Sequence, residues 1–238
     1  MVEARRFSAT IEIQGKLWIL GGSDNDFNDL QSSEFLQSSG SSSGPMLPEE
    51  LESHCVTSLS ETVVMVIGGN IPHYYNGKGA SRNTYLYDFD AKQWKSGPPM
   101  SAKRVSPGCT SFVHNDKVNV VVAGGVGDYS NTVNTPYYDS TELLLPETED
   151  GWQWIPGPTL PIKVNAPAMV TLDYTVYLLG GSVQLEHPMI EAVDTIFQLQ
   201  TFPSYEWINS NNYLKVARTH FKAFKVPGDY IRDTYQDK

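Results

Sequence analysis

The chain has 238 residues with a net charge of −10 at neutral pH, 40% apolar residues and 11% aromatic residues. This length and composition fit one globular all-β domain, and no apolar stretch is long enough to cross a bilayer as a helix. Because binding to a phosphate backbone needs a basic face, the acidic balance argues against a nucleic-acid partner.

Along the chain, four aliphatic stretches that are typical of β-strands each end in a pair of glycines. The first glycines of successive pairs are 47, 56 and 56 residues apart. One such pair would indicate only a turn, but periods of about 40 to 50 residues are typical of β-propellers. The pairs are Gly21, Gly22, Gly68, Gly69, Gly124, Gly125, Gly180 and Gly181.

The residues around each glycine pair predict four strands per repeat, which is one propeller blade. A first strand and a short polar turn precede the strand that ends in the glycines, and two further strands follow a loop of variable length. The fourth strand carries Trp94, Trp154 or Trp207, which stand 25, 29 and 26 residues after the second glycine. We expect these large apolar side chains to be buried between blades.

This pattern resembles the Kelch repeat of the galactose-oxidase-like propellers over essentially the whole chain. The resemblance rests on the glycine pairs, the tryptophans, Tyr85 and Tyr87 in the third strand of the second repeat, and Gly-Pro turns. It implies an all-β, Kelch-type propeller of four four-stranded blades plus a lone fifth strand, and leaves an incomplete ring open. The expected ranges are 1–227 for the propeller, 5–46, 52–100, 104–160 and 164–213 for its blades, 218–227 for the terminal strand and 228–238 for a tail.

Two regions depart from the repeat. Residues 38–45 replace the fourth strand of the first repeat with a Ser/Gly-rich stretch that is typical of a flexible linker. Both ends of the chain carry the start of a repeat, so neither completes the other. We therefore expect further sequence upstream, as a six-bladed parent would need.

The loops after the second strands are the longest, and strand alternation places them on one face with the connections between repeats. Because binding residues often lie on variable loops of a rigid scaffold, we expect this face to bind a protein partner, as Kelch propellers commonly do. For each arginine in this set, a structural hydrogen bond to nearby backbone is the alternative. The candidate residues are Arg5, Arg6, Asp24, Asp26, Phe27, His73, Tyr74, Tyr75, Arg104, Asp128, Tyr129 and Arg218.

No motif predicts a metal, a cofactor or an enzyme. The stretch Ser23–Asp29 resembles a calcium loop, but Asp29 stands where glycine is needed and Phe35 where glutamate is needed. Gly124 and Gly125 lack the third glycine and the helix of a dinucleotide site. The alternative function is a propeller enzyme or small-ligand binder of galactose-oxidase-like architecture that uses the central channel. For His54 and His220, a satisfied histidine near the core is the better interpretation.

The two cysteines leave the compartment open. Cys55 and Cys109 lie in first strands of neighbouring repeats, where we expect buried free thiols. A disulfide is the alternative and would need an oxidising compartment. The first ten residues lack the apolar core of a secretory signal. The chain as written is therefore expected in the cytoplasm, or outside the cell if upstream sequence carries a signal peptide.

Overall fold

The computed structural model describes residues 3–71, 79–128, 136–148, 151–185 and 189–225. In this part of the chain the regular elements are β-strands, which form four four-stranded antiparallel sheets in succession. The same residues contain no helix, and so none that could span a membrane. The sequence-based prediction of a four-bladed, all-β propeller is confirmed.

Each sheet is one blade, and its strands follow chain order from the centre outward. Blade 1 contains β1 (Ala9–Ile13), β2 (Lys16–Leu20), β3 (Ser33–Gln37) and β4 (Gly40–Ser43). Blade 2 contains β5 (Cys55–Ser58), β6 (Val63–Ile67), β7 (Thr84–Asp88) and β8 (Gln93–Ser96). Blade 3 contains β9 (Gly108–His114), β10 (Lys117–Ala123), β11 (Thr141–Thr148) and β12 (Gly151–Pro156). Blade 4 contains β13 (Ala168–Leu172), β14 (Thr175–Leu179), β17 (Thr195–Gln200) and β18 (Glu206–Tyr213), with a small hairpin of β15 (Ser182–Gln184) and β16 (Ile190–Ala192) in its loop.

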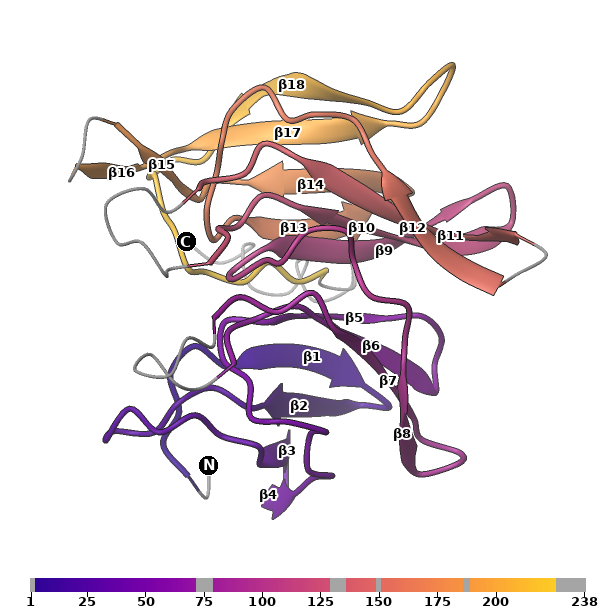
Figure 1. Cartoon of the computed structure of the whole chain (residues 1–238), viewed down its shortest axis with the longest axis vertical. Coiled ribbons are helices and arrows are strands. Elements are labelled where there is room, and N and C mark those ends of the chain that lie inside the picture. The colour runs from indigo at the N-terminus through magenta and orange to yellow at the C-terminus, as the bar shows by residue number, and fades with distance from the viewer. Residues whose placement is uncertain (1–2, 72–78, 129–135, 149–150, 186–188, 226–238) are drawn as a thin grey trace, which may run out of the picture.

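The innermost strands of neighbouring blades contact one another in the order β1, β5, β9 and β13. In Figure 1, blades 1 and 2 form the lower half of the molecule and blades 3 and 4 the upper half. The β15–β16 hairpin, which belongs to a second-to-third loop, lies at the left of this view, and the hairpin of β11 and β12 extends to the right. The two ends of the blades therefore form two distinct faces, as strand alternation predicts.

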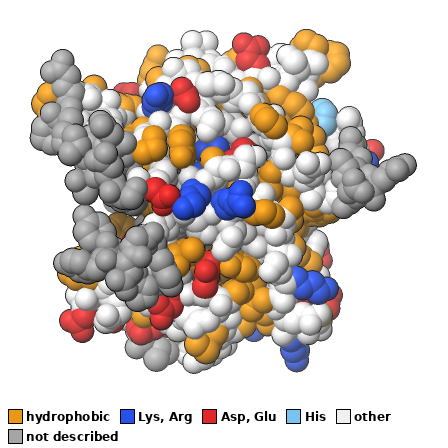
Figure 2. Space-filling view, in the orientation of Figure 1, with side chains coloured by type: hydrophobic (Ala, Val, Ile, Leu, Met, Phe, Trp, Pro, Cys, Tyr) orange, Lys and Arg blue, Asp and Glu red, His pale blue; other side chains and the backbone are white. Residues whose placement is uncertain are grey.

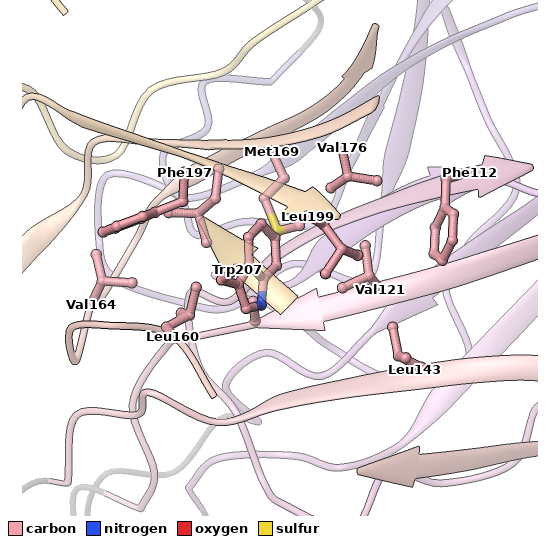
Figure 3. Close-up of a cluster of buried hydrophobic side chains, with 12 residues drawn as sticks. Phe112, Val121, Leu143, Leu160, Val164, Met169, Val176, Phe197, Leu199 and Trp207 are labelled. Atoms are coloured by element: carbon pink, nitrogen blue, oxygen red, sulfur yellow. The ribbon is translucent and has the colours of Figure 1, made fainter. Parts of the chain in front are cut away.

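Apolar side chains fill the three interfaces between consecutive blades. The cluster between blades 3 and 4 surrounds Trp207 and includes Phe112 and Phe197 (Figure 3). A second cluster around Trp154 joins blades 2 and 3, and a third around Trp18 joins blades 1 and 2. Among the described residues, no such cluster joins blade 4 to blade 1.

The outer tryptophans occupy these interfaces, as the sequence pattern predicted. Trp154 and Trp207 are buried, and each indole N–H donates to the preceding blade or to its outgoing connection. Trp154 Nε1 is 2.9 Å from the carbonyl oxygen of Pro98, and Trp207 Nε1 is 2.9 Å from Thr141 Oγ1. Trp94 is only partly buried and lies against Trp18 of blade 1, with ring centroids 5.9 Å apart.

The glycine pairs form the corner at which each second strand leaves its sheet. At Gly68 φ is +62° and at Gly69 it is +102°, a backbone region that L-residues rarely adopt. A Cβ at Gly68 would lie 2.7 Å from the carbonyl oxygen of Arg104, so a side chain there would collide with the backbone of the next blade. Glycine is needed both for the conformation and for this close approach.

The residues before each first strand, here called the repeat heads, form a hydrogen-bonded series around the channel. The amide of Ser53 donates to Phe7, and that of Ser106 donates to Ser53, each at 2.8 Å. Ala166 and His220 continue the series at 3.1 and 3.2 Å. All five residues have positive φ, between 49° and 55°. Within the described backbone, no hydrogen bond from Phe7 to His220 closes the series.

The Ser/Gly-rich stretch of blade 1 does form a fourth strand, which corrects the expectation of a flexible linker. Gly40–Ser43 pairs with β3 over four residues, although its side chains are mostly exposed. Local composition favours a flexible chain, but the free edge of β3 offers backbone partners. The hydrogen bond of 2.6 Å from Ser33 Oγ to the carbonyl oxygen of Pro45 helps to hold the end of this strand.

The C-terminal repeat head does not begin a fifth strand within residues 218–225, contrary to the expectation. Arg218 meets blade 4 as the next head would, because the amide of Gly181 donates to its carbonyl oxygen at 2.9 Å. The chain then runs between the two halves of the molecule (Figure 1). Phe221 and Phe224 line a cavity with residues of β1, β5, β9 and β13. Among the described residues no further strand pairs with this segment, which lies beside the four innermost strands.

The two cysteines form a disulfide, so the expectation of free thiols was wrong. Cys55 in β5 and Cys109 in β9 have their Cα atoms 6.0 Å apart. Both lie in innermost strands of neighbouring blades, which brings residues 54 positions apart into contact across the interface of blades 2 and 3. The bond fastens these two blades beside the channel.

Replacing Trp154 with alanine should lower the free energy of unfolding by about 3 to 5 kcal/mol, as expected for a large buried aromatic side chain. The loss would come from emptying the interface of blades 2 and 3. The denaturant midpoint of purified protein measures it, with Trp152→Ala as a control because Trp152 is 37% exposed. An unchanged midpoint for Trp154→Ala would contradict the assignment of the outer strand.

Replacing Cys55 and Cys109 together with alanine should lower the free energy of unfolding by about 4 kcal/mol, because the disulfide restricts a long loop of the unfolded chain. Denaturant unfolding in the absence and presence of a reducing agent measures this effect. The unaltered protein should lose most of its advantage over the double variant once it is reduced. Equal stability of the two proteins without reductant would contradict the role given to the disulfide.

Candidate functional site

The face that carries the second-to-third loops is the candidate functional face, here called the loop face. Isolated backbone bridges extend each blade onto it beyond the glycine pair, such as Arg6 with Ser23 and Ser23 with Asp29 in blade 1. The repeat heads lie on the same side, because each is bridged to the residue that follows a glycine pair. Heads and loops therefore surround the mouth of the channel together.

Two of the candidate arginines lie in the interior. Arg104 is 0% exposed, and its guanidinium donates to the carbonyl oxygens of Gly124 and Ser140 at 2.8 and 3.0 Å. Arg5 makes the equivalent bonds in blade 1, to Gly21 at 3.1 Å and Ser32 at 2.9 Å. Both arginines therefore make structural hydrogen bonds to nearby backbone, which was the alternative to binding a partner. Each stabilises the glycine corner of its own blade.

Each of these arginines is paired with a glutamate that the sequence interpretation missed. Arg104 Nη2 lies 3.1 Å from Glu142, and Arg5 Nη2 lies 3.0 Å from Glu34, with all four side chains at most 5% exposed. Burial lowers the pKa of Arg104, and the charge of Glu142 opposes that effect. The sequence carried a signal for these ion pairs. The repeats that form blades 1 and 3 have an arginine and a glutamate at the two equivalent positions, whereas those that form blades 2 and 4 have neither.

The other described candidates are exposed or partly exposed on the loop face. Phe27 is 75% exposed, and the guanidinium carbon of Arg6 lies 3.4 Å from its ring centroid. Asp128 forms an ion pair with Lys103 at 2.9 Å. Asp26 and Arg218 are exposed. His73, Tyr74, Tyr75 and Tyr129 lie outside the described residues.

In the loop that resembles a calcium site, the first carboxylate accepts hydrogen bonds from amides of the same loop. The side-chain amide of Asn28 donates to Asp24 Oδ2 at 3.0 Å, and the backbone amides of Asn28 and Asp26 donate to Oδ1 at 2.9 and 2.8 Å. These hydrogen bonds lower the pKa of Asp24. Asp29 lies beside Glu52, and burial together with that carboxylate raises the pKa of Asp29 to about 7. Within the described ranges, no group of three or more His, Cys, Asp or Glu side chains is placed to hold a metal ion.

The mouth of the channel contains a cavity of about 370 Å³. Residues of all four blades and of the C-terminal segment line it. They are Arg5, Arg6, Phe7, Ser8, Thr10, Ser53, His54, Ser106, Pro107, Ala166, Pro167, His220, Phe221 and Lys222. Next to this cavity, Phe221 and Phe224 line a smaller one with residues of the four innermost strands.

His54 is buried at this mouth with both ring nitrogens unpartnered, which corrects the interpretation of it as a satisfied core histidine. It is 3% exposed, and its ring packs against the corner at Gly21. Burial, assisted by the charge of Lys222, lowers the pKa of His54 to about 3. His220, by contrast, is exposed and lies against Phe7, with ring centroids 6.2 Å apart.

Comparison with known proteins points to the Kelch-like proteins. The chain is similar to Kelch-like protein 38 of rat, with 28% identity over 145 residues, which are 60% of this chain and 22% of the relative. The mouse protein gives 27% identity over the same coverage, and the human protein gives 26% over 110 residues, 46% of this chain and 17% of the relative. No family model matches the chain.

The chain folds as a four-bladed β-propeller and is similar in sequence to Kelch-like proteins. Its blades, glycine corners and outer tryptophans agree with the similarity to the Kelch-like relatives. The chain spans about a fifth of the length of these relatives, so the similarity concerns one part of each of them.

Buried His54 should contribute a loss of stability as the pH falls below the ordinary pKa of histidine, because the unfolded chain takes up a proton that His54 refuses. With a folded-state pKa of about 3, this contribution amounts to about 2 kcal/mol between pH 7 and pH 5. Asp29, whose pKa is raised to about 7, opposes it over the same range because the folded state takes up a proton there. The contribution of His54 is therefore measured in the Asp29→Asn background, where adding His54→Asn should flatten the dependence of the unfolding free energy on pH. An unchanged dependence would contradict the neutral, buried state of His54.

Proposed function

We propose that this Kelch-type propeller is a protein–protein interaction module that binds its partner with the loop face. The observation that carries the proposal is the exposed aromatic side chain of Phe27, stacked under the guanidinium of Arg6. Aromatic and arginine side chains are the types that most often dominate binding at protein interfaces. The similarity to Kelch-like proteins supports a protein-binding role at the level of the fold.

The two faces differ in what they can offer to a partner. On the opposite face the first and second strands are joined by turns such as Gln14–Gly15 and Asn115–Asp116, which leave little room for variation. On the loop face the corresponding connections are longer and carry acidic side chains, including Asp26 and Asp128. An acidic rim favours a partner with a basic surface, and that attraction should weaken as salt is raised.

The galactose-oxidase-like alternative finds little support in the described residues. Cys55 and Cys109 are bonded to each other, so neither thiol is available for a crosslink to tyrosine. Phe221 and Phe224 lie beside the innermost strands, where a catalytic centre on the propeller axis would need space.

The chain offers a matched pair of aromatic residues for the test. Phe27 on the loop face and Tyr174 on the opposite face are 75% and 80% exposed, and both have a φ of 65°. Asparagine tolerates this backbone region well, so Phe27→Asn and Tyr174→Asn should both fold. Phe27→Asn should reduce capture of partner proteins from a native extract several-fold, and Tyr174→Asn should leave it unchanged.

The readout is the amount of each captured protein at two salt concentrations, normalised to the bait. Loss on Phe27→Asn with retention on Tyr174→Asn supports the loop face. Equal loss from both variants, or loss from Tyr174→Asn alone, would place binding elsewhere on the molecule.

A further inference from the structure

The cavity at the mouth of the channel is lined by three cationic side chains. Arg5, Arg6 and Lys222 line it together with His54 and His220, and its lining includes no Asp or Glu. Arg5 is neutralised by Glu3 and Glu34. Among the described residues, neither Arg6 nor Lys222 takes part in an ion pair. Such a lining is unexpected in a protein with a net charge of −10.

Buried donors at this mouth also lack hydrogen-bond partners. Arg6 donates through Nε to Ser23 Oγ at 3.2 Å, and its ring contact with Phe27 fixes the guanidinium plane. Its Nη2 is buried and has no partner, and the same holds for Nδ1 and Nε2 of His54. Buried polar groups in native proteins are rarely left without a partner, because their desolvation is costly.

We propose that this cavity binds a small anionic molecule through a carboxylate or phosphate group, held by Arg6, His54 and Lys222. A guanidinium with free N–H groups suits both oxyanions. The positive charge of Lys222, which is exposed at the mouth, would attract the anion. The hydroxyl-bearing residues Ser8, Ser53 and Ser106 line the same cavity and offer further donors.

The size of the cavity limits the ligand to a small molecule. Its volume of about 370 Å³ lies at the lower end of the range for small-molecule sites. Phe7, Pro107 and Phe221 provide apolar walls. The ligand class is therefore a compact organic acid or phosphate ester, with the charged group toward Arg6 and Lys222 and the remainder against these walls.

The site is assembled from segments far apart in the sequence. Arg6 belongs to the first repeat head, His54 to the second and Lys222 to the C-terminal segment. Lys222 reaches the cavity only because its segment enters the channel after docking on blade 4 through Arg218. In Figure 2, Lys and Arg side chains are visible near the boundary between the two halves of the molecule, where that segment runs.

Isothermal titration calorimetry with the full chain tests the proposal, with citrate and inorganic phosphate as probes in a zwitterionic buffer of constant ionic strength. Chloride serves as the control anion. We expect saturable binding of at least one probe and none of chloride. A blocked peptide, acetyl-Gly-Glu-Gly-amide, distinguishes a free anion from a carboxylate carried on a polypeptide.

Three variants locate the binding. Arg6→Gln and Lys222→Met should each weaken binding of the probe at least tenfold. Lys103→Gln, which removes a 53% exposed cation on the same face but outside the cavity, should leave it unchanged. Because Lys222 is not part of the blade cores, its variant keeps the test valid even if Arg6→Gln folds poorly.

Each outcome decides the question. Binding of citrate or phosphate that depends on Arg6 and Lys222 supports the small-anion site. Binding of the peptide alone assigns the oxyanion to a polypeptide and overturns the small-molecule assignment. Absence of binding by all probes, or equal weakening by Lys103→Gln, overturns the site and leaves solvent as the partner of the buried donors. None of these results depends on whether Phe27 contacts a partner protein.

Discussion

The structure depends on one repeated hydrogen bond, from the second glycine of each pair to the head of the next repeat. The amide of Gly22 donates to Leu51, that of Gly69 to Arg104, and that of Gly125 to Val164, each at 2.8 Å. Only glycine allows the backbone to approach this closely with positive φ. The bond sets the position of each blade on the one before it, and so determines where the heads, the channel and the loop face lie. At Gly181 the same bond positions Arg218, with no further blade among the described residues to follow.

Side-chain interactions stabilise these backbone contacts in two ways, which alternate from one blade to the next. In blades 1 and 3 a buried arginine binds the carbonyl oxygen of the first glycine and is neutralised by a glutamate of the third strand. In blades 2 and 4 the equivalent positions are the apolar residues Leu51 and Val164, which join the inter-blade clusters. Truncating one partner of a buried pair would leave the other charge uncompensated, which is strongly destabilising. The arginines therefore belong to the scaffold, and the loops carry the exposed chemistry.

The C-terminal segment contacts the scaffold at blade 4 and lines the cavity at the mouth of the channel. It docks on blade 4 as a further repeat head and then enters the channel, where Phe221 and Phe224 contribute apolar bulk. The channel thus has apolar side chains beside its innermost strands and a polar mouth on the loop face. A protein partner on the loops and a small anion at the mouth would lie on the same side of the molecule. The chemistry of the two sites differs, because the rim is acidic whereas the mouth is cationic.

The sequence by itself determined the blades, the glycine corners and the outer tryptophans, because these follow from local periodicity and from residue types that few backbone positions allow. It also placed Arg6 among twelve candidate residues of the loop face, whose binding role stays a prediction. The pairing of Cys55 with Cys109, the buried bonds of Arg5 and Arg104, and the meeting of His54 with Lys222 were decided only by the tertiary structure. Each of these joins segments that are distant in sequence, and their distances depend on how one blade is rotated onto the next. The path of residues 218–225 was decided in the same way, since no described strand pairs with this strand-like segment and its conformation depends on its contacts with blade 4 and the innermost strands.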